Sequence, residues 1–204
     1  MSNYDFLNTT IPSKKQIREF LNSFPYDEMS AAVFEYSLNL YDEAIGEFFS
    51  ASNFANTPYE REFAQQLNSL SSASDIVNMM RKPTSPLAKR ALMQKLMQVE
   101  DDALELIKTK CMTNMQDYFI ENAVRFFVNC KENCCEWILE NFDDFRSDYL
   151  KSMLCIVIGF RGEPSNIPFL IEKAFYFLNF FSDESFEQAP ALAVEEIAVR
   201  FKLI

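Results

Sequence analysis

The sequence predicts an all-α fold, because helix-start signals recur along the chain and no segment alternates apolar and polar residues as a strand does. Only 3 of the 204 residues are glycine, fewer than the turns of a β-sandwich or an open α/β enzyme usually need. Apolar residues make up 49% of the chain, a share typical of proteins with a packed core rather than of disordered ones.

The first predicted helix begins after Ser13, because Ser13 and Gln16 have the spacing of a capping box. Pro25 cannot continue a helix and ends it. Asp27 is placed to cap a second helix that runs to about Ser50, with apolar residues recurring on one face.

A third helix begins at residues 57–60 (Thr-Pro-Tyr-Glu), which combine a cap, a proline at the first helical position and a glutamate at the third. We expect a break near residues 71–72, with residues 74–75 (Ser-Asp) capping a short extension. Residues 85–86 (Ser-Pro) repeat the cap-then-proline signal and predict the next helix.

The second half of the chain is periodic. Four similar helices begin 32, 30 and 38 residues apart, at residues 90–97, 122–129, 152–159 and 190–197. Second helices are expected between them, around residues 103–110, 134–142 and 167–180. Paired helices at this period are typical of an α-solenoid. We therefore expect a single domain, with an irregular helical N-terminal cap at residues 1–82 and helix-pair repeats at residues 83–204.

The clearest joint between two helices is residues 158–171, Ile-Gly-Phe-Arg-Gly-Glu-Pro-Ser-Asn-Ile-Pro-Phe-Leu-Ile. We expect Gly162 to take the left-handed conformation that closes the first helix, and Ser165 or Asn166 to cap the second. Pro168 is expected in the first turn of that second helix, where the backbone N–H groups lack partners in any case.

This joint resembles the turn and second helix of a HEAT repeat, which commonly reads Leu-Gly, two residues, Gly-Asp-Pro, and then Ile/Val-Pro-x-Leu-Ile. Glu163 stands where the family has aspartate, and the other helix pairs match the spacing without the glycines. The resemblance to this armadillo-type family implies a right-handed α-α superhelix whose second helices line a concave face. It also implies a scaffold that binds other proteins.

On that face we expect an acidic surface for a protein partner, because opposite potentials steer encounter and reject wrong partners. The expected partner is a basic segment or a basic protein surface. The candidate partner-binding residues are Glu105, Lys108, Glu136, Glu140, Glu172 and Tyr176.

The net charge of −11 is spread along the chain, and no basic face is visible in the sequence. Because nucleic-acid binding draws most of its affinity from neutralised phosphates, this balance argues against it and against an anionic membrane surface. The longest uncharged apolar run, residues 153–160, is too short for a membrane helix, and the first residues lack a signal-peptide pattern. Five cysteines within apolar helical patterns indicate a reducing compartment, so we expect a cytoplasmic protein.

The chain contains no histidine, which excludes Ser-His and Cys-His triads and imidazole metal sites. Cys130, Cys134 and Cys135 form the tightest thiol cluster, but neither Cys111 nor Cys155 has the spacing of a fourth zinc ligand. We expect the cysteines to be small buried hydrophobic residues. The three glycines match no phosphate-binding loop, so no catalytic residue, metal or cofactor is predicted.

Two further groups of residues have more than one interpretation. The acidic residues at 100–102, 143–144 and 195–196 are expected to be solvated or to cap helices rather than to do acid–base chemistry. The aromatic run at 175–181 is either buried between the final helices or exposed along one edge as a docking patch. Tyr176 and Asn179 would share its less buried edge.

The leading hypothesis is a non-catalytic protein-interaction scaffold. One alternative is a DNA glycosylase for alkylated bases, since some HEAT-like proteins have that activity and use aromatic residues with a catalytic aspartate. The only tryptophan, Trp137, is near Asp117 and Asp143 in sequence alone. A second alternative is a subunit that self-associates through the aromatic C-terminal edge.

Overall fold

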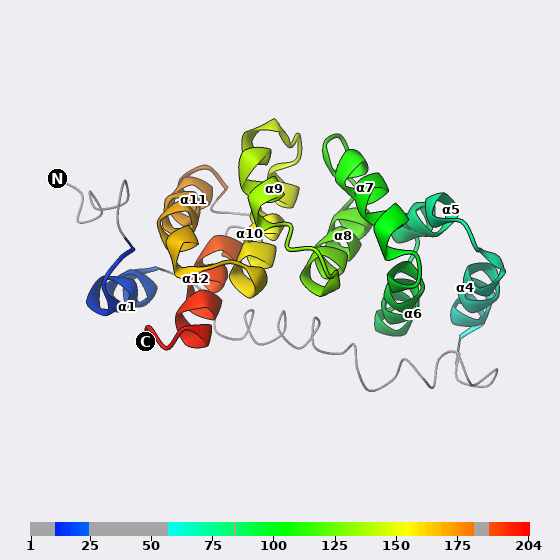
Figure 1. Ribbon diagram of the computed structural model, residues 1–204, viewed down its shortest axis with the longest axis horizontal. Helices are drawn as coiled ribbons and strands as arrows, with labels where there is room; N and C mark the ends of the chain where they lie inside the picture. Colours follow the sequence, from blue (N-terminus) through cyan, green and yellow to red (C-terminus); the bar gives the residue numbers. More distant parts are fainter. Residues whose placement is uncertain (1–10, 25–56, 84, 182–187) are drawn as a thin grey trace. The chain divides into compact units, whose positions relative to one another are not determined.

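The computed structural model describes residues 11–24, 57–83, 85–181 and 188–204, and all secondary structure in these ranges is helical (Figure 1). The prediction of an all-α chain is confirmed for this part. The helix predicted at residues 27–50 lies outside the described residues. The α-helices are α1 (Lys14–Ser23), α4 (Pro58–Ser69), α5 (Ala73–Asn78), α6 (Pro86–Met97), α7 (Glu100–Cys111), α8 (Asp117–Asn129), α9 (Cys135–Glu140), α10 (Asp148–Arg161), α11 (Ile167–Phe180) and α12 (Ala189–Arg200). Short 3-10 helices are η1 (Met79–Arg81), η2 (Phe142–Asp144) and η3 (Pro164–Asn166).

The helix starts that depend on local capping lie where the sequence predicts them. In α1 the Gln16 N–H donates to Ser13 Oγ at 3.4 Å, and the Ser13 N–H donates to Gln16 Oε1 at 2.9 Å. Thr57 and Glu60 form the same reciprocal pair at the start of α4. The Ser85 hydroxyl likewise accepts from a backbone N–H in the first turn of α6. Each cap satisfies donors that the helix itself leaves unpaired.

The predicted cap of α5 is wrong by two residues. Ser72, in extended conformation, is the N-cap, and its Oγ accepts from the Asp75 N–H at 3.1 Å. Ser74 lies inside the first turn of α5. Ser71, Ser72 and Ser74 all lie shortly before Asp75, and only Ser72 is three residues away, the spacing at which a capping hydroxyl reaches that N–H.

The chain divides into two compact units, and residues 31–131 form the second of them. In its described part, helices two apart in the chain pack together: α4 on α6, α6 on α8, and α5 on α7. Figure 1 shows α5 and α7 on one side of α4 and α6. Alternate helices therefore form two layers within this unit, and α4 and α5 take part in them.

The first unit contains residues 1–30 and 132–204. Within it α10 packs on α12 and α11, and α1 packs on α12. The rings of Phe20 in α1 and of Phe24, which directly follows α1, contact Phe175 of α11, with centroids 5.8 and 6.3 Å from that of Phe175. This grouping differs from the single cap expected at residues 1–82. The apolar face of α1 is covered by the last helices, and α4 and α5 belong with α6–α8.

Two glycines serve close packing: Gly159 within α10 and Gly162 directly after its last residue. A Cβ on Gly159 would lie 2.8 Å from Ala193 Cα, so the backbones of α10 and α12 nearly touch there. Gly162 has φ −83°, not the left-handed conformation predicted. A Cβ on Gly162 would lie 2.5 Å from the Ile158 carbonyl oxygen and 2.6 Å from Asn166 Oδ1, so lack of space requires glycine.

The turn after α10 also differs from the prediction. Neither Ser165 nor Asn166 caps α11 with its side chain; instead Asn166 Oδ1 accepts from the Glu163 N–H at 2.8 Å and closes η3. Pro168 lies in the first turn of α11 as predicted. The guanidinium of Arg200 in α12 donates from Nη2 to the Gly159 and Gly162 carbonyl oxygens, each at 2.7 Å.

Candidate interaction surfaces

Two of the predicted partner-binding residues lie on α7, in the second unit. The side chain of Glu105 is exposed, and Lys108 Nζ pairs with Glu105 Oε1 at 3.3 Å. This pair of neighbouring residues leaves little unbalanced charge on the described surface of α7 at that point. Both residues therefore lie on a helix, within the range expected to be helical, and they form a local ion pair.

The other four predicted residues lie in the first unit, on α9 and α11. Glu136 and Glu140 of α9 are exposed. On α11, Glu172 is exposed and pairs with Lys173 at 3.1 Å, and Tyr176 is 41% exposed. Each of these side chains is open to a partner.

Aromatic contacts connect η2, which follows α9, to α11. The Phe142 ring of η2 and the Phe169 ring of α11 meet edge to face, with centroids 5.0 Å apart. Lys173 Nζ lies 5.2 Å from both centroids, a distance at which a cation is attracted to a ring face. These contacts place η2, which begins two residues after Glu140, beside α11.

Residues 132–144 carry five carboxylates and no lysine or arginine. All five side chains are exposed: Glu132, Glu136, Glu140, Asp143 and Asp144. We call these five, together with Glu172 and Tyr176 of α11, the acidic face. Basic residues outside this run contact the acidic face: Arg161 Nη2 donates to the Glu132 carbonyl oxygen at 3.4 Å, and Lys173 pairs with Glu172 at 3.1 Å. Within residues 132–144 the sequence itself supplies no basic side chain to balance the five carboxylates.

The aromatic run at 175–181 is partly core and partly exposed. Phe177 is fully buried, and Phe175 packs against α1. Tyr176 and Asn179 are exposed, as predicted, and Phe180 is 71% exposed, with its ring centroid 5.0 Å from that of Tyr176. The interpretation as buried core thus applies to Phe177, and the interpretation as an exposed edge applies to Tyr176 and Phe180.

The acidic residues near the helix ends form ion pairs or lie where the helix dipole favours negative charge. Glu100 is buried, accepts from the Lys131 N–H, and pairs with Lys131 Nζ at 3.7 Å. Asp101 and Asp102 are exposed in the first turn of α7, where negative charge is favoured by the helix dipole. Glu196 lies 3.9 Å from Arg200. These positions agree with the prediction of capping and solvation, with Glu100 buried rather than solvated.

All five cysteines are buried free thiols, as predicted. Burial raises the pKa of Cys111 and Cys155 well above the usual range, and Lys173 partly opposes this at Cys155. Burial also raises the pKa of Cys135 to about 11, although the charges of Arg161 and Arg200 lower it. Within the described ranges, no three cysteine or acidic side chains are grouped to hold a metal ion. Neutral, enclosed thiols of this kind are poor nucleophiles.

The residues considered for a glycosylase do not form a described site. Trp137 packs edge to face against Phe145, with centroids 5.5 Å apart, and Asp143 is exposed. Asp117 belongs to the other unit.

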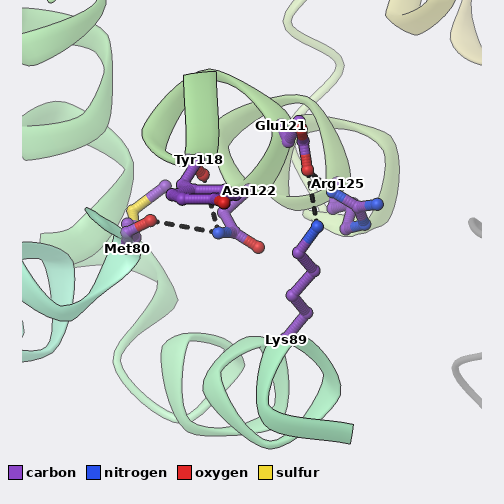
Figure 2. A network of polar contacts seen from close by, with 6 residues as sticks. All are labelled: Met80, Lys89, Tyr118, Glu121, Asn122 and Arg125. Atoms are coloured by element: carbon purple, nitrogen blue, oxygen red, sulfur yellow. Dashed lines mark hydrogen bonds and ion pairs between the residues drawn. The ribbon is translucent and has the colours of Figure 1, made fainter. Parts of the chain in front are cut away.

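A polar network between α6 and α8 was not predicted from the sequence (Figure 2). Lys89 Nζ donates to Glu121 Oε2 at 2.6 Å, and Arg125 Nη1 lies 3.6 Å from the same oxygen. Lys89 Nζ also lies 5.9 Å from the centre of the Tyr118 ring. The available signals were the spacing of four between Glu121 and Arg125 and a polar residue at 122 within an apolar helix.

Asn122 lies at the centre of this network and is fully buried. Its Nδ2 donates to the carbonyl oxygens of Met80 at 3.0 Å and Tyr118 at 2.7 Å. The first bond ties η1 to α8 (Figure 2). Its Oδ1 is buried and accepts no hydrogen bond from the described residues.

No described helix is both long enough and apolar enough to span a bilayer. Comparison of the chain with family models, with curated proteins and with solved structures gives no match in any of the three. The functional argument therefore depends on the chain's own residues.

Proposed function

We propose that this chain is a non-catalytic scaffold that binds a basic segment of a protein partner on the acidic face. The observation that carries the proposal is the run of five exposed carboxylates at residues 132–144 without a lysine or arginine among them. Lysine and arginine side chains form charge-assisted hydrogen bonds with such groups. The exposed ring of Tyr176 adds a surface on which a guanidinium can stack.

The same proposal includes a HEAT-like architecture, arranged as a right-handed superhelix. Its support is the packing of alternate helices in two layers within the second unit, together with the Gly-Glu-Pro joint after α10. Stacked helix pairs bury their apolar faces against neighbouring pairs and leave an extended surface for binding. Five free thiols suit the reducing conditions of the cytoplasm, where we place the protein.

Binding on this face should be shared among several weak contacts. An exposed ion pair contributes only about 0–1 kcal/mol, so no single carboxylate should dominate. Charges within about 8 Å of one another act together at physiological salt, and their effect falls as salt rises. A peptide with several basic residues is therefore the suitable probe, and its affinity should fall steeply with added salt.

The test is charge reversal. Glu136→Lys/Glu140→Lys, with and without Glu172→Lys, should weaken binding of a fluorescent Lys/Arg-rich peptide by at least about tenfold, which corresponds to about 1.4 kcal/mol. Fluorescence anisotropy measures this at two salt concentrations, and affinity capture from the source cell tests the natural partner.

The matched control is Glu19→Lys/Glu62→Lys, which makes the same charge change at exposed positions on α1 and α4. The proposal requires the control to retain most of the affinity. Equal loss in both variants would show a general charge effect, and unchanged binding in the first would contradict the proposal directly.

Self-association is a second candidate function, favoured by the exposure of Phe180 beside Tyr176. An exposed pair of aromatic rings is a common anchor of protein interfaces. Light scattering across a concentration series measures the mass of the wild type and of Phe180→Ser. A mass that is monomeric at every concentration would exclude this candidate.

A further inference from the structure

A lysine of the chain itself contacts the acidic face. Lys173 of α11 directly follows Glu172, and its Nζ lies 3.1 Å from Glu172 Oε1. This pair contrasts with residues 132–144, where five exposed carboxylates occur without a lysine or arginine. The position of the Lys173 ammonium therefore bears on how this face binds a basic partner.

Two aromatic rings and one carboxylate hold this ammonium. Its Nζ lies 5.2 Å from the ring centroids of both Phe142 in η2 and Phe169 in α11. These rings meet edge to face with centroids 5.0 Å apart, so the cation is attracted to both at once. The Lys173 side chain is only 16% exposed, which indicates that its methylene stem lies along the protein surface rather than extending into solvent. The ammonium is thus kept at a defined place beside Glu172.

Glu172 remains accessible to a partner. Its side chain is 63% exposed, although one of its oxygens pairs with Lys173. A carboxylate has two oxygens with several lone-pair positions, so an incoming lysine or arginine can still donate to it. Lys173 nevertheless weakens the attraction, because charges within about 8 Å of one another interact at physiological salt and its positive charge repels a second cation.

The contacts of Lys173 are of the same kind as those expected between the acidic face and its partner. Ammonium groups bind carboxylates through charge-assisted hydrogen bonds and bind aromatic rings through cation–π attraction. Lys173 makes both kinds of contact within the chain. In the free protein it therefore takes a position that suits a basic side chain of the partner.

We propose that Lys173 is an internal competitor of the basic partner: it occupies the position formed by Glu172, Phe142 and Phe169 in the free chain, and the partner displaces it. Displacement requires only rotation about the bonds of the lysine side chain, so no helix has to move. The carboxylates of residues 132–144 attract the partner, and the exchange at Glu172 disfavours segments that carry too few basic residues. This inference rests on the proposed function, because it describes the regulation of binding at the same face.

The test removes the charge of the lysine and keeps its apolar stem. Lys173→Met should strengthen binding of a fluorescent Lys/Arg-rich peptide to the full chain by at least about threefold, because a repelling charge within the screening length is lost. Lys15→Met on α1 is the matched control, since Lys15 also pairs with an exposed glutamate, Glu19, at 3.6 Å. Fluorescence anisotropy measures the affinities, and circular dichroism establishes that each variant is folded. Lys173→Gln should have the same effect and serves if the methionine variant does not fold. Equal effects of the substitutions at 173 and at 15 would contradict the proposal.

A double-mutant cycle determines whether Lys173 acts through Glu172. Glu172→Gln should weaken peptide binding by less than about twofold in the wild type, where Lys173 pairs with the carboxylate, and by at least about threefold in the Lys173→Met background. This difference is the coupling that competition for one carboxylate requires. Equal losses in the two backgrounds would show that the two side chains act separately, and would contradict the proposal.

The outcomes distinguish this inference from the proposed function. If Glu136→Lys/Glu140→Lys weakens peptide binding and Lys173→Met leaves it unchanged, the basic partner is retained and the competition is overturned. If neither the wild type nor Lys173→Met binds the peptide saturably, both proposals are overturned. Binding that is detected only after the lysine is replaced would support the competition most directly.

Discussion

Arg200 shows how one side chain can complete a helix end. The last carbonyl groups of α10 lack partners within the helix, and they carry partial negative charge. Arg200 Nη2 donates to two of the oxygens in that region, at Gly159 and Gly162, and its plane lies near the Phe201 ring. The packing of α12 on α10 therefore depends on a charge-assisted contact as well as on the close approach at Gly159.

Removing this contact should destabilise the first unit. Arg200→Met should lower the free energy of unfolding by about 1.5–3 kcal/mol, because hydrogen bonds from a charged group are lost and the carbonyl oxygens are left unpaired. Urea denaturation followed by the fluorescence of Trp137, the only tryptophan, reports on this unit. Arg146→Met is the matched control: Arg146 is exposed, and its replacement should change stability by less than about 0.5 kcal/mol.

The buried thiols make stability depend on alkaline pH. In the folded protein, burial raises the pKa of Cys111 and Cys155, so they stay neutral, whereas the unfolded thiols ionise near their ordinary value of 9.0. Stability is thus fully present below about pH 9 and falls above it, by about 1.4 kcal/mol per pH unit for each thiol. Urea denaturation at several pH values measures the slope. Cys111→Ala/Cys155→Ala should flatten it, and an unchanged slope would contradict this explanation.

At the scale of elements, the starts of α1, α4 and α6 were predictable because a cap is a pattern within three residues of sequence. The turn after α10 was less predictable. Gly162 suggested a left-handed helix end, but its role depends on the Ile158 carbonyl and the Asn166 side chain. The need for glycine at this position arises from how closely these atoms pack, and the sequence near Gly162 does not reveal that packing.

Ser72 and Ser74 provide a matched test of the cap of α5. Ser72→Ala should lower the free energy of unfolding by about 1 kcal/mol, because the Asp75 N–H loses its acceptor. Ser74→Ala should be neutral or slightly stabilising, since alanine is the better residue inside a helix. Urea denaturation followed by far-ultraviolet circular dichroism measures both. A larger loss of unfolding free energy for Ser74→Ala than for Ser72→Ala would instead support Ser74 as the N-cap, as expected from the sequence.

At the scale of the molecule, the sequence identified exposed acidic positions but not the network of Lys89, Glu121 and Arg125 between α6 and α8. Glu136, Glu140 and Glu172 could be named because each is polar within an amphipathic helix. Lys89 and Glu121 are 32 residues apart and meet only because α6 packs on α8. A contact between helices that are two apart in the chain requires the fold, so no spacing in the sequence indicates it.

The attachment of α1 to the last helices should dominate the stability of the first unit. Phe20 is fully buried against Phe24 and Phe175, so Phe20→Ala should lower the free energy of unfolding by about 3–5 kcal/mol. The Trp137 fluorescence transition should move to lower urea. Arg18→Ala, on the exposed side of the same helix, is the control. The same urea midpoint for Phe20→Ala and the wild type would show that the packing of α1 does not contribute to the stability of the first unit.

The pairing of α1 with α12 also has a consequence for synthesis. Lys14 Nζ donates to the Lys202 carbonyl oxygen at 2.7 Å, across a separation of 188 residues. During translation, α1 leaves the ribosome long before α11 and α12 are made. The helices against which its apolar side packs are therefore missing while α4–α8 are synthesised. The second unit can fold as it emerges, but the first can close only after α11 and α12 have been made. Until then the nascent chain carries an uncovered aromatic face, and this is the interval in which a chaperone would be needed.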